Sequence, residues 1–331
     1  MELTTQEIDS LVRSDMERIE ATLTECVTGS GPLVDELTSH LSRAGGKRMR
    51  PMLSLLCAQL GAPGETANQR VINAATAVEL THLATLYHDD VMDAAPQRRG
   101  VPAAQHQWGN NRAILAGDVL FARASRLVAP LGQDSIDHHA RTFERLCTGQ
   151  LNETFGPDEG DDPVEFYLQV LADKTGSLIQ AAAVFGSWHS GAPREYSDAV
   201  GLYGERIGVA FQLADDVIDL TSDAEVSGKT PGTDLLEGVV TLPILLLQRQ
   251  RGNGALDADG EELLAAFESG IEDAQLAGVV EALAAHPVVE ETRQMARKWA
   301  DEAVATLRPL PDGAVKETLV EFAAMMVDRM N

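Results

Sequence analysis

Cysteine, aromatic residues and long apolar runs are all scarce in this sequence. Its three cysteines, Cys26, Cys57 and Cys147, have neither the number nor the spacing of a disulfide framework or a zinc site. Aromatic residues are 5% of the chain, and no alternating apolar–polar run is long enough to predict a sheet. The longest strongly apolar run, Val239–Leu247, is too short to span a bilayer and contains a proline. The polar, acidic start is unlike a signal peptide. These absences predict a soluble, cytoplasmic, all-α protein.

Positive charge is also scarce. The chain has 26 Lys and Arg residues against 51 Asp and Glu residues, which gives a formal net charge of −25. Nucleic acid requires a basic surface, so it is excluded as a partner. Small phosphorylated ligands are not excluded, because they need only a few well-placed cations and metal ions.

Glycine and proline divide the chain into helical segments without a linker long enough to separate domains. No solenoid repeat is visible. The sequence therefore predicts one large helical domain over residues 1–331, with a polar loop at 222–238 and another loop at 98–102. The predicted helices cover residues 5–27, 33–43, 51–60, about 66–92, 108–128, 134–155, 163–190, 194–221, 241–250, 260–285, 289–307 and 314–329.

Two acidic motifs carry the functional signal. YHDDVMD (87–93) ends an apolar helix, and LADDVIDL (213–220) repeats the Asp-Asp-Val-x-Asp pattern after another. Asp89 and Asp93 are four residues apart, so they lie one turn apart on the same helix face, and Asp215 and Asp219 share this spacing. Paired carboxylates repel unless cations neutralise them. This donor set suits Mg²⁺, with Mn²⁺ as a substitute, bound together with a diphosphate. Two solvated helix ends are the plainer alternative.

Diphosphate also requires Lys and Arg beside the metal. Candidate cations stand in turns and loops. They are Lys47, Arg48, Arg50, Arg98, Arg99, Lys174 and Lys229.

With these elements in order, the chain resembles the trans-isoprenyl diphosphate synthases, or polyprenyl synthetases. The further matching segments are GGKRMRP (45–51), RRG (98–100), GDVLFA (117–122), GQ (149–150), DKTG (173–176), FQ (211–212), GKTPGTDLLEG (228–238) and TLP (241–243). The motif-bearing core covers about residues 31–250, and C-terminal helices follow at 251–331. The resemblance implies an all-α isoprenoid-synthase bundle around a deep central cavity, usually a homodimer.

The resemblance also implies an activity: head-to-tail condensation of isopentenyl diphosphate with an allylic diphosphate. Carried over position by position, Asp89, Asp93 and Asp215 would ligate Mg²⁺, with Asp90 and Asp219 in support. Arg98, Lys174 and Lys229 would bind the allylic diphosphate. Lys47, Arg50, His82 and Arg99 would hold isopentenyl diphosphate. Thr175 and Gln212 would flank the reacting carbons, and Phe211 would pack beside isopentenyl diphosphate.

One position departs from the resembled pattern. Relatives commonly have Lys where this chain has Val239, so a contact to the allylic diphosphate is expected to be weaker. The positions that limit product length in the family, Thr85, Ala84 and Thr81, are small here. Their size predicts a medium or long all-trans product, hexaprenyl to decaprenyl, for a quinone side chain. The enzyme is expected to touch a membrane surface transiently when such a product is released.

Several alternatives stay open at this point. A geranylgeranyl or farnesyl diphosphate synthase would make a shorter product. A non-catalytic regulatory subunit is disfavoured because both acidic motifs are intact, and a terpene cyclase because Lys47 and Arg50 are present. A helical protein merely stabilised by Ca²⁺ or Mg²⁺ would bind metal without releasing pyrophosphate.

Overall fold

The computed structural model describes residues 4–62, 64–221 and 231–330. These residues form helices, with one two-stranded hairpin as their only sheet. The all-α prediction is confirmed. The chain clusters into two compact units. Unit 1 contains residues 1–145, 177–204 and 306–319, and unit 2 contains residues 146–176, 205–305 and 320–331. The single domain over 1–331 stays a prediction.

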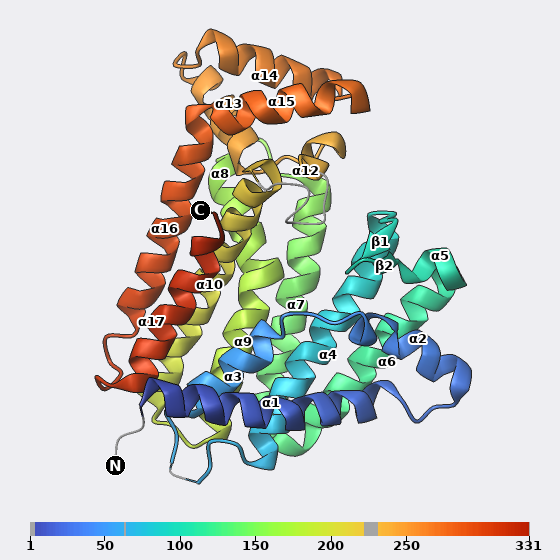
Figure 1. The fold of residues 1–331 in the computed structure, drawn as a ribbon, viewed down its shortest axis with the longest axis vertical. Coiled ribbons are helices and arrows are strands. Elements are labelled where there is room, and N and C mark those ends of the chain that lie inside the picture. The colour runs from blue at the N-terminus through green and yellow to red at the C-terminus, as the bar shows by residue number, and fades with distance from the viewer. Residues whose placement is uncertain (1–3, 63, 222–230, 331) are drawn as a thin grey trace. The chain divides into compact units, whose positions relative to one another are not determined.

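Unit 1 is built around the apolar helix that carries the first acidic motif. Its elements are α1 (Thr5–Val27), α2 (Pro32–Arg43), α3 (Met49–Ala58), α4 (Gln69–Met92), β1 (Gln97–Arg98), β2 (Val101–Pro102), α5 (Ala104–Trp108), α6 (Asn110–Val128) and a 3₁₀ turn (Ala129–Leu131). It also contains the whole of α9 (Ser177–His189) and the start of α7 (Gln133–Phe155) and of α10 (Arg194–Thr221). Helices α4 and α6 run side by side (Figure 1). Of the loop predicted at 98–102, only Arg99 and Gly100 form a turn, and the other three residues belong to the strands of the β1–β2 hairpin.

Close packing in unit 1 depends on small residues at helix crossings. A Cβ at Gly117 on α6 would lie 2.3 Å from the His88 ring on α4, and one at Gly186 on α9 would lie 2.0 Å from the Ser54 carbonyl oxygen on α3. Any larger residue would separate these helices. Gly117 therefore fixes the approach of α6 to the end of α4 that carries the acidic motif.

Unit 2 carries the second acidic motif. Its remaining elements are α8 (Pro163–Leu171), a π-helical turn (Ala172–Gly176), α12 (Thr233–Leu236), α13 (Leu242–Gly252), α14 (Ala258–Ser269), α15 (Asp273–Ala285), most of α16 (Pro287–Thr306), the end of α17 (Ala314–Val327) and a 3₁₀ turn (Asp328–Met330). The single helix expected over 260–285 is wrong. It breaks after Ser269 because Gly270 adopts a left-handed φ of 83°.

The π-helical turn interrupts the helix that the sequence predicts over 163–190. It contains Lys174 and Thr175, and α10 approaches it closely: a Cβ at Gly208 would lie 2.5 Å from the Gly176 Cα. Such turns recur at functional sites because they re-aim the side chains of a helix. None of the helices in the described ranges has both the length and the hydropathy to cross a bilayer.

Candidate functional site

The accessible face of α4 contains the first candidate site. In the second half of this largely buried helix and at its C-cap, the accessible residues His82, Thr85, Leu86, Asp89 and Asp93 follow the spacing of one helical face. We call this row the α4 stripe. A candidate diphosphate ligand, a candidate length-determining residue and two candidate metal ligands therefore share one face.

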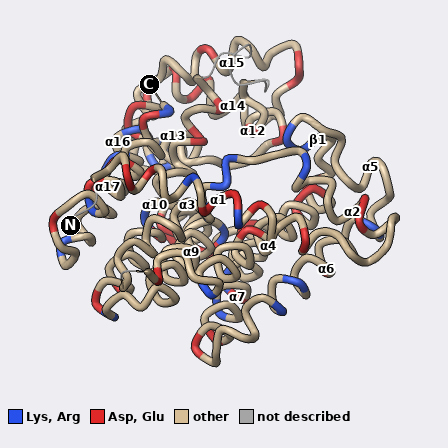
Figure 2. Tube along the Cα trace, turned by 60° about the horizontal axis from the view of Figure 1, so that its bottom comes forward, with Lys and Arg blue, Asp and Glu red and all other residues tan. Residues whose placement is uncertain are grey.

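The middle aspartate of the first motif has a different role in the structure. Asp90 is 0% exposed, and the Arg98 Nε donates a hydrogen bond of 2.6 Å to its Oδ1. Burial raises the pKa of Asp90, and the Arg98 charge opposes that rise. Figure 2 shows basic positions in blue near β1, beside acidic positions of α4 in red. Asp90 thus fixes the arginine expected to bind the allylic diphosphate. Its support of a metal ion stays a prediction.

A basic cluster lies beside the α4 stripe. Burial lowers the pKa of Arg50 to about 10, with a further contribution from Arg99, while Glu79 opposes the change. The pKa of His82 is well below its ordinary value, because of burial and then because Arg50, Arg99, Arg98 and Arg48 act on it. The buried Arg50 Nε has no hydrogen-bond partner among the described residues. Such a cluster suits an anion with several oxygens. Lys47 is exposed at its edge.

The length-determining candidates are not equivalent. Thr81 and Ala84 are fully buried, and the Ala84 carbonyl oxygen packs near Gly117 of α6. Thr85 is half-buried within the α4 stripe. Of the three, only Thr85 presents a partly accessible side chain on the same face as Asp89.

The second motif has the same arrangement on α10 in unit 2. Phe211, Gln212, Asp215, Ile218 and Asp219 are half-buried and share one helical face, which we call the α10 stripe. The first and last aspartates of the motif are therefore accessible here too, and they are joined by both residues of the FQ pair.

The middle aspartate of the second motif is again buried. The Tyr167 hydroxyl and the Leu242 backbone N–H donate hydrogen bonds of 2.8 and 3.2 Å to Asp216 Oδ2. Burial raises the pKa of Asp216 to about 8, against the effect of these two donors. Asp216 connects α10 to α8 and to the start of α13.

The remaining candidates in unit 2 lie on the π-helical turn. Lys174 Nζ forms an ion pair with Glu153 of α7, and Thr175 is half-buried. A Cβ at Gly149 would lie 3.0 Å from the Lys174 backbone nitrogen, so α7 approaches the turn closely. Lys229 lies outside the described residues.

Sequence reasoning missed three charged contacts to candidate residues. Arg329 Nη1 lies 3.1 Å from Asp215 Oδ1, and the Arg329 guanidinium stands 5.0 Å from the Phe211 ring centroid. Glu153 pairs with Lys174, and Glu79 acts on Arg50. Arg329 belongs to no motif. For Glu153 and Glu79, the only signal was proximity in sequence to GQ and to His82.

The donor set fits a divalent cation shared with a ligand. Within the described ranges, no group of three or more His, Cys, Asp or Glu side chains converges on one point. Each stripe instead offers two carboxylates one turn apart. Mg²⁺ is characteristically bound by one or two carboxylates, with waters and substrate phosphates completing its shell. Asp89 with Asp93, and Asp215 with Asp219, are therefore suited to hold metal ions in the presence of a diphosphate.

The helices of the described residues, with an accessible aspartate pair on each of two of them, are what the resemblance to an isoprenoid synthase implies. The polyprenyl synthetase family model matches residues 31–273. The chain is 42% identical over 319 residues to the nonaprenyl diphosphate synthase of Mycobacterium tuberculosis, covering 96% of this chain and 93% of the relative. It is 33% identical to the octaprenyl diphosphate synthase of Escherichia coli, covering 98% of each chain.

Solved structures agree with the sequence relatives. A geranylgeranyl pyrophosphate synthase from Corynebacterium glutamicum, complexed with calcium and isoprenyl diphosphate, superposes with a TM-score of 0.86 at 40% identity over 98% of each chain. The protein belongs to the polyprenyl synthetase family.

Proposed function

We propose that this protein is a Mg²⁺-dependent trans-prenyltransferase. It condenses isopentenyl diphosphate head-to-tail (1′-4) with an allylic diphosphate and releases pyrophosphate. The observation that carries this proposal is the pair of stripes: each DDxxD motif presents its outer aspartates on an accessible face and buries its middle aspartate. Family membership supports the same reaction.

The residues of unit 1 have distinct roles in the proposed reaction. Asp89 and Asp93 hold metal ions, which neutralise the charge that develops on the leaving diphosphate. Arg98, oriented by Asp90, binds the allylic diphosphate. Isopentenyl diphosphate is held by a separate group, namely Lys47, Arg50, His82 and Arg99. The low pKa of His82 keeps its ring neutral, so one ring nitrogen donates a hydrogen bond without adding charge.

The residues of unit 2 have proposed roles of their own. Asp215 and Asp219 hold the second set of metal ions, and Lys174 and Lys229 bind the allylic diphosphate. Thr175 and Gln212 present oxygen dipoles to the allylic cation, and Phe211 packs beside isopentenyl diphosphate. Glu153 pairs with Lys174 and Arg329 pairs with Asp215, so both contacts lie at residues assigned here to phosphate and metal.

The proposed product is a medium or long all-trans polyprenyl diphosphate, hexaprenyl to decaprenyl. The small side chains of Thr81, Ala84 and Thr85 support it, as do the nonaprenyl and octaprenyl relatives. A specific finding favours a second candidate, geranylgeranyl diphosphate, because a solved relative at 40% identity bears that name.

The proposed assembly is a cytoplasmic homodimer that touches a membrane surface transiently when the insoluble product leaves. Exposed apolar side chains support a protein partner for unit 1. Ile114 and Leu115 on α6 and Ile136 and Phe143 on α7 are all exposed large apolar residues.

One incubation tests both the reaction and the product. The protein is mixed with Mg²⁺, isopentenyl diphosphate and, in separate tubes, dimethylallyl, geranyl, farnesyl or geranylgeranyl diphosphate. Pyrophosphate release is measured, and products are sized by chromatography. We expect Mg²⁺-dependent condensation and chains of 30 to about 50 carbons. No condensation with any primer would refute the activity, while a 20-carbon end product would select the second candidate.

A further inference from the structure

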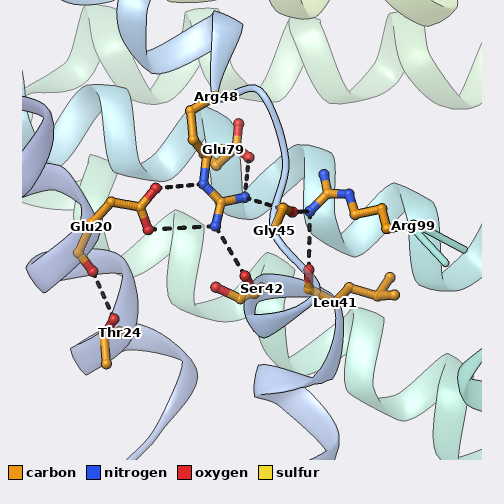
Figure 3. A network of polar contacts seen from close by, with 8 residues as sticks. All are labelled: Glu20, Thr24, Leu41, Ser42, Gly45, Arg48, Glu79 and Arg99. Carbon is orange, nitrogen blue, oxygen red and sulfur yellow. Dashed lines mark hydrogen bonds and ion pairs between the residues drawn. The ribbon is translucent and has the colours of Figure 1, made fainter. Parts of the chain in front are cut away.

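Arg48 stands between two residues that we assign to isopentenyl diphosphate, Lys47 and Arg50, yet its guanidinium is directed into the protein (Figure 3). A guanidinium has five N–H donors. Arg48 donates to both Glu20 carboxylate oxygens, to Glu79 Oε1, and to the Gly45 and Ser42 carbonyl oxygens, at 2.6 to 3.5 Å. All five donors are used, so Arg48 has none left for a ligand.

The backbone of Arg48 also departs from the ordinary. Its φ of 49° is left-handed, which is uncommon for a residue with a side chain, and it occupies the position just before α3 begins. Left-handed geometry costs about 1 kcal/mol or more unless the surroundings hold it. The five hydrogen bonds of the Arg48 side chain stabilise this backbone conformation. This conformation sets the direction in which α3 starts, and hence where Arg50 points two residues later.

Glu79 is the buried partner in this arrangement. Its side chain is 2% exposed on α4, and its Oε1 accepts from Arg48 at 3.0 Å. Burial raises the pKa of Glu79, while Arg50, Arg48 and Arg99 oppose the rise. Its charge therefore offsets the repulsion among three arginines that would otherwise be crowded beside His82.

Arg99 reaches the same loop from the other side. Its Nη1 donates to the Leu41 carbonyl oxygen at 3.0 Å and to the Gly45 carbonyl oxygen (Figure 3). A Cβ at Gly46 would lie 3.0 Å from the Arg99 guanidinium carbon, so this glycine leaves room for the arginine. The Gly45 carbonyl oxygen thus joins Arg48 and Arg99 through one loop.

We propose that Arg48 and Glu79 are positioning residues for isopentenyl diphosphate: they bind each other, and together they hold Lys47, Arg50 and Arg99 in the orientation that receives its diphosphate. This inference rests on the proposed function. Neither residue contacts the substrate. The pair acts on the isopentenyl side of the reaction and leaves binding of the allylic diphosphate unchanged.

The test compares three purified full-length variants with the wild type. Arg48→Lys keeps the charge but loses the planar fork that reaches four partners. Glu20→Gln weakens the same hydrogen bonds to Arg48 at a partly exposed position, so it should destabilise the fold less than Arg48→Lys. Arg13→Lys, at an exposed position of α1, is the matched control. KM for isopentenyl diphosphate, KM for the allylic primer, kcat and the thermal midpoint are measured for each.

We expect Arg48→Lys to raise KM for isopentenyl diphosphate about tenfold or more, because it removes hydrogen bonds to charged groups. Glu20→Gln should raise it about threefold. KM for the allylic primer should stay within about twofold in both, and Arg13→Lys should match the wild type.

Each other outcome has a distinct meaning. An inactive wild type refutes the proposed function itself. If the wild type is active, equal rises in both KM values, or a lower thermal midpoint with an unchanged KM for isopentenyl diphosphate, refute the positioning role. If Arg48→Lys does not fold, the two KM values of Glu20→Gln decide alone.

Discussion

The two adjacent aspartates of the first motif, Asp89 and Asp90, provide the sharpest test of the site. Asp89 lies in the α4 stripe, whereas Asp90 is fully buried against Arg98 at 2.6 Å. We predict that Asp89→Asn weakens metal binding much more than Asp90→Asn does. Loss of Asp90 should act instead through Arg98, whose orientation for the allylic diphosphate depends on this ion pair.

The size of the Asp90→Asn effect follows from the burial of the pair. Removing one partner of a buried ion pair costs about 3–5 kcal/mol. The Arg98 side chain is 32% exposed, so water recovers part of its solvation, and Asn retains an oxygen that accepts a hydrogen bond. We therefore expect the free energy of unfolding to fall by about 2 kcal/mol. KM for the allylic substrate should rise about tenfold.

Initial rates over a range of Mg²⁺ concentrations, together with urea unfolding, measure both effects. Asp89→Asn should raise the Mg²⁺ concentration for half-maximal rate at least tenfold, and Asp90→Asn should change it by less than about twofold. Asp89→Asn is thus the matched control for its neighbour. A tenfold rise in Mg²⁺ requirement for Asp90→Asn, with an unchanged free energy of unfolding, would refute this division of roles.

Three further predictions concern single positions. Val239→Lys should lower KM for the allylic substrate by restoring a cation, and steady-state kinetics showing no change or a rise would contradict this. Thr85→Phe should shorten the product while short primers are still used. Ala84→Phe should shorten the product too, and it should also lower the urea midpoint because Ala84 is buried against α6. An unchanged product distribution in both variants would exclude control of product length by α4. Burial lowers the pKa of His189 to about 4, and the side chain is 7% exposed. Its neutral form therefore stabilises the fold above pH 6.5, and up to about 3 kcal/mol is lost as the pH falls from 6.5 to 4. Urea midpoints at pH 7 and 5 should differ less in His189→Asn than in the wild type.

The helices were largely predictable because their signals are local. The stretch 5–27 is α1 with the same bounds, and 194–221 is α10, since amphipathic spacing and flanking glycine or proline act within a few residues. The break at Gly270 and the π-helical turn at Ala172–Gly176 were not predicted. The residues on both sides of Gly270 have a helical pattern, so the break was not visible in the sequence. The π-helical turn packs against Gly208 of α10, which is distant in sequence.

The sequence by itself determined that Asp89 and Asp93 share a helix face, as do Asp215 and Asp219, because spacing along a helix fixes that geometry. It also determined which residue types could meet a diphosphate. Only the tertiary structure decided that the middle aspartates turn inward, Asp90 to Arg98 and Asp216 to Tyr167. Residues that are far away in sequence decide which face of a helix is buried and which cation pairs with which carboxylate. A local sequence pattern contains no information about these residues.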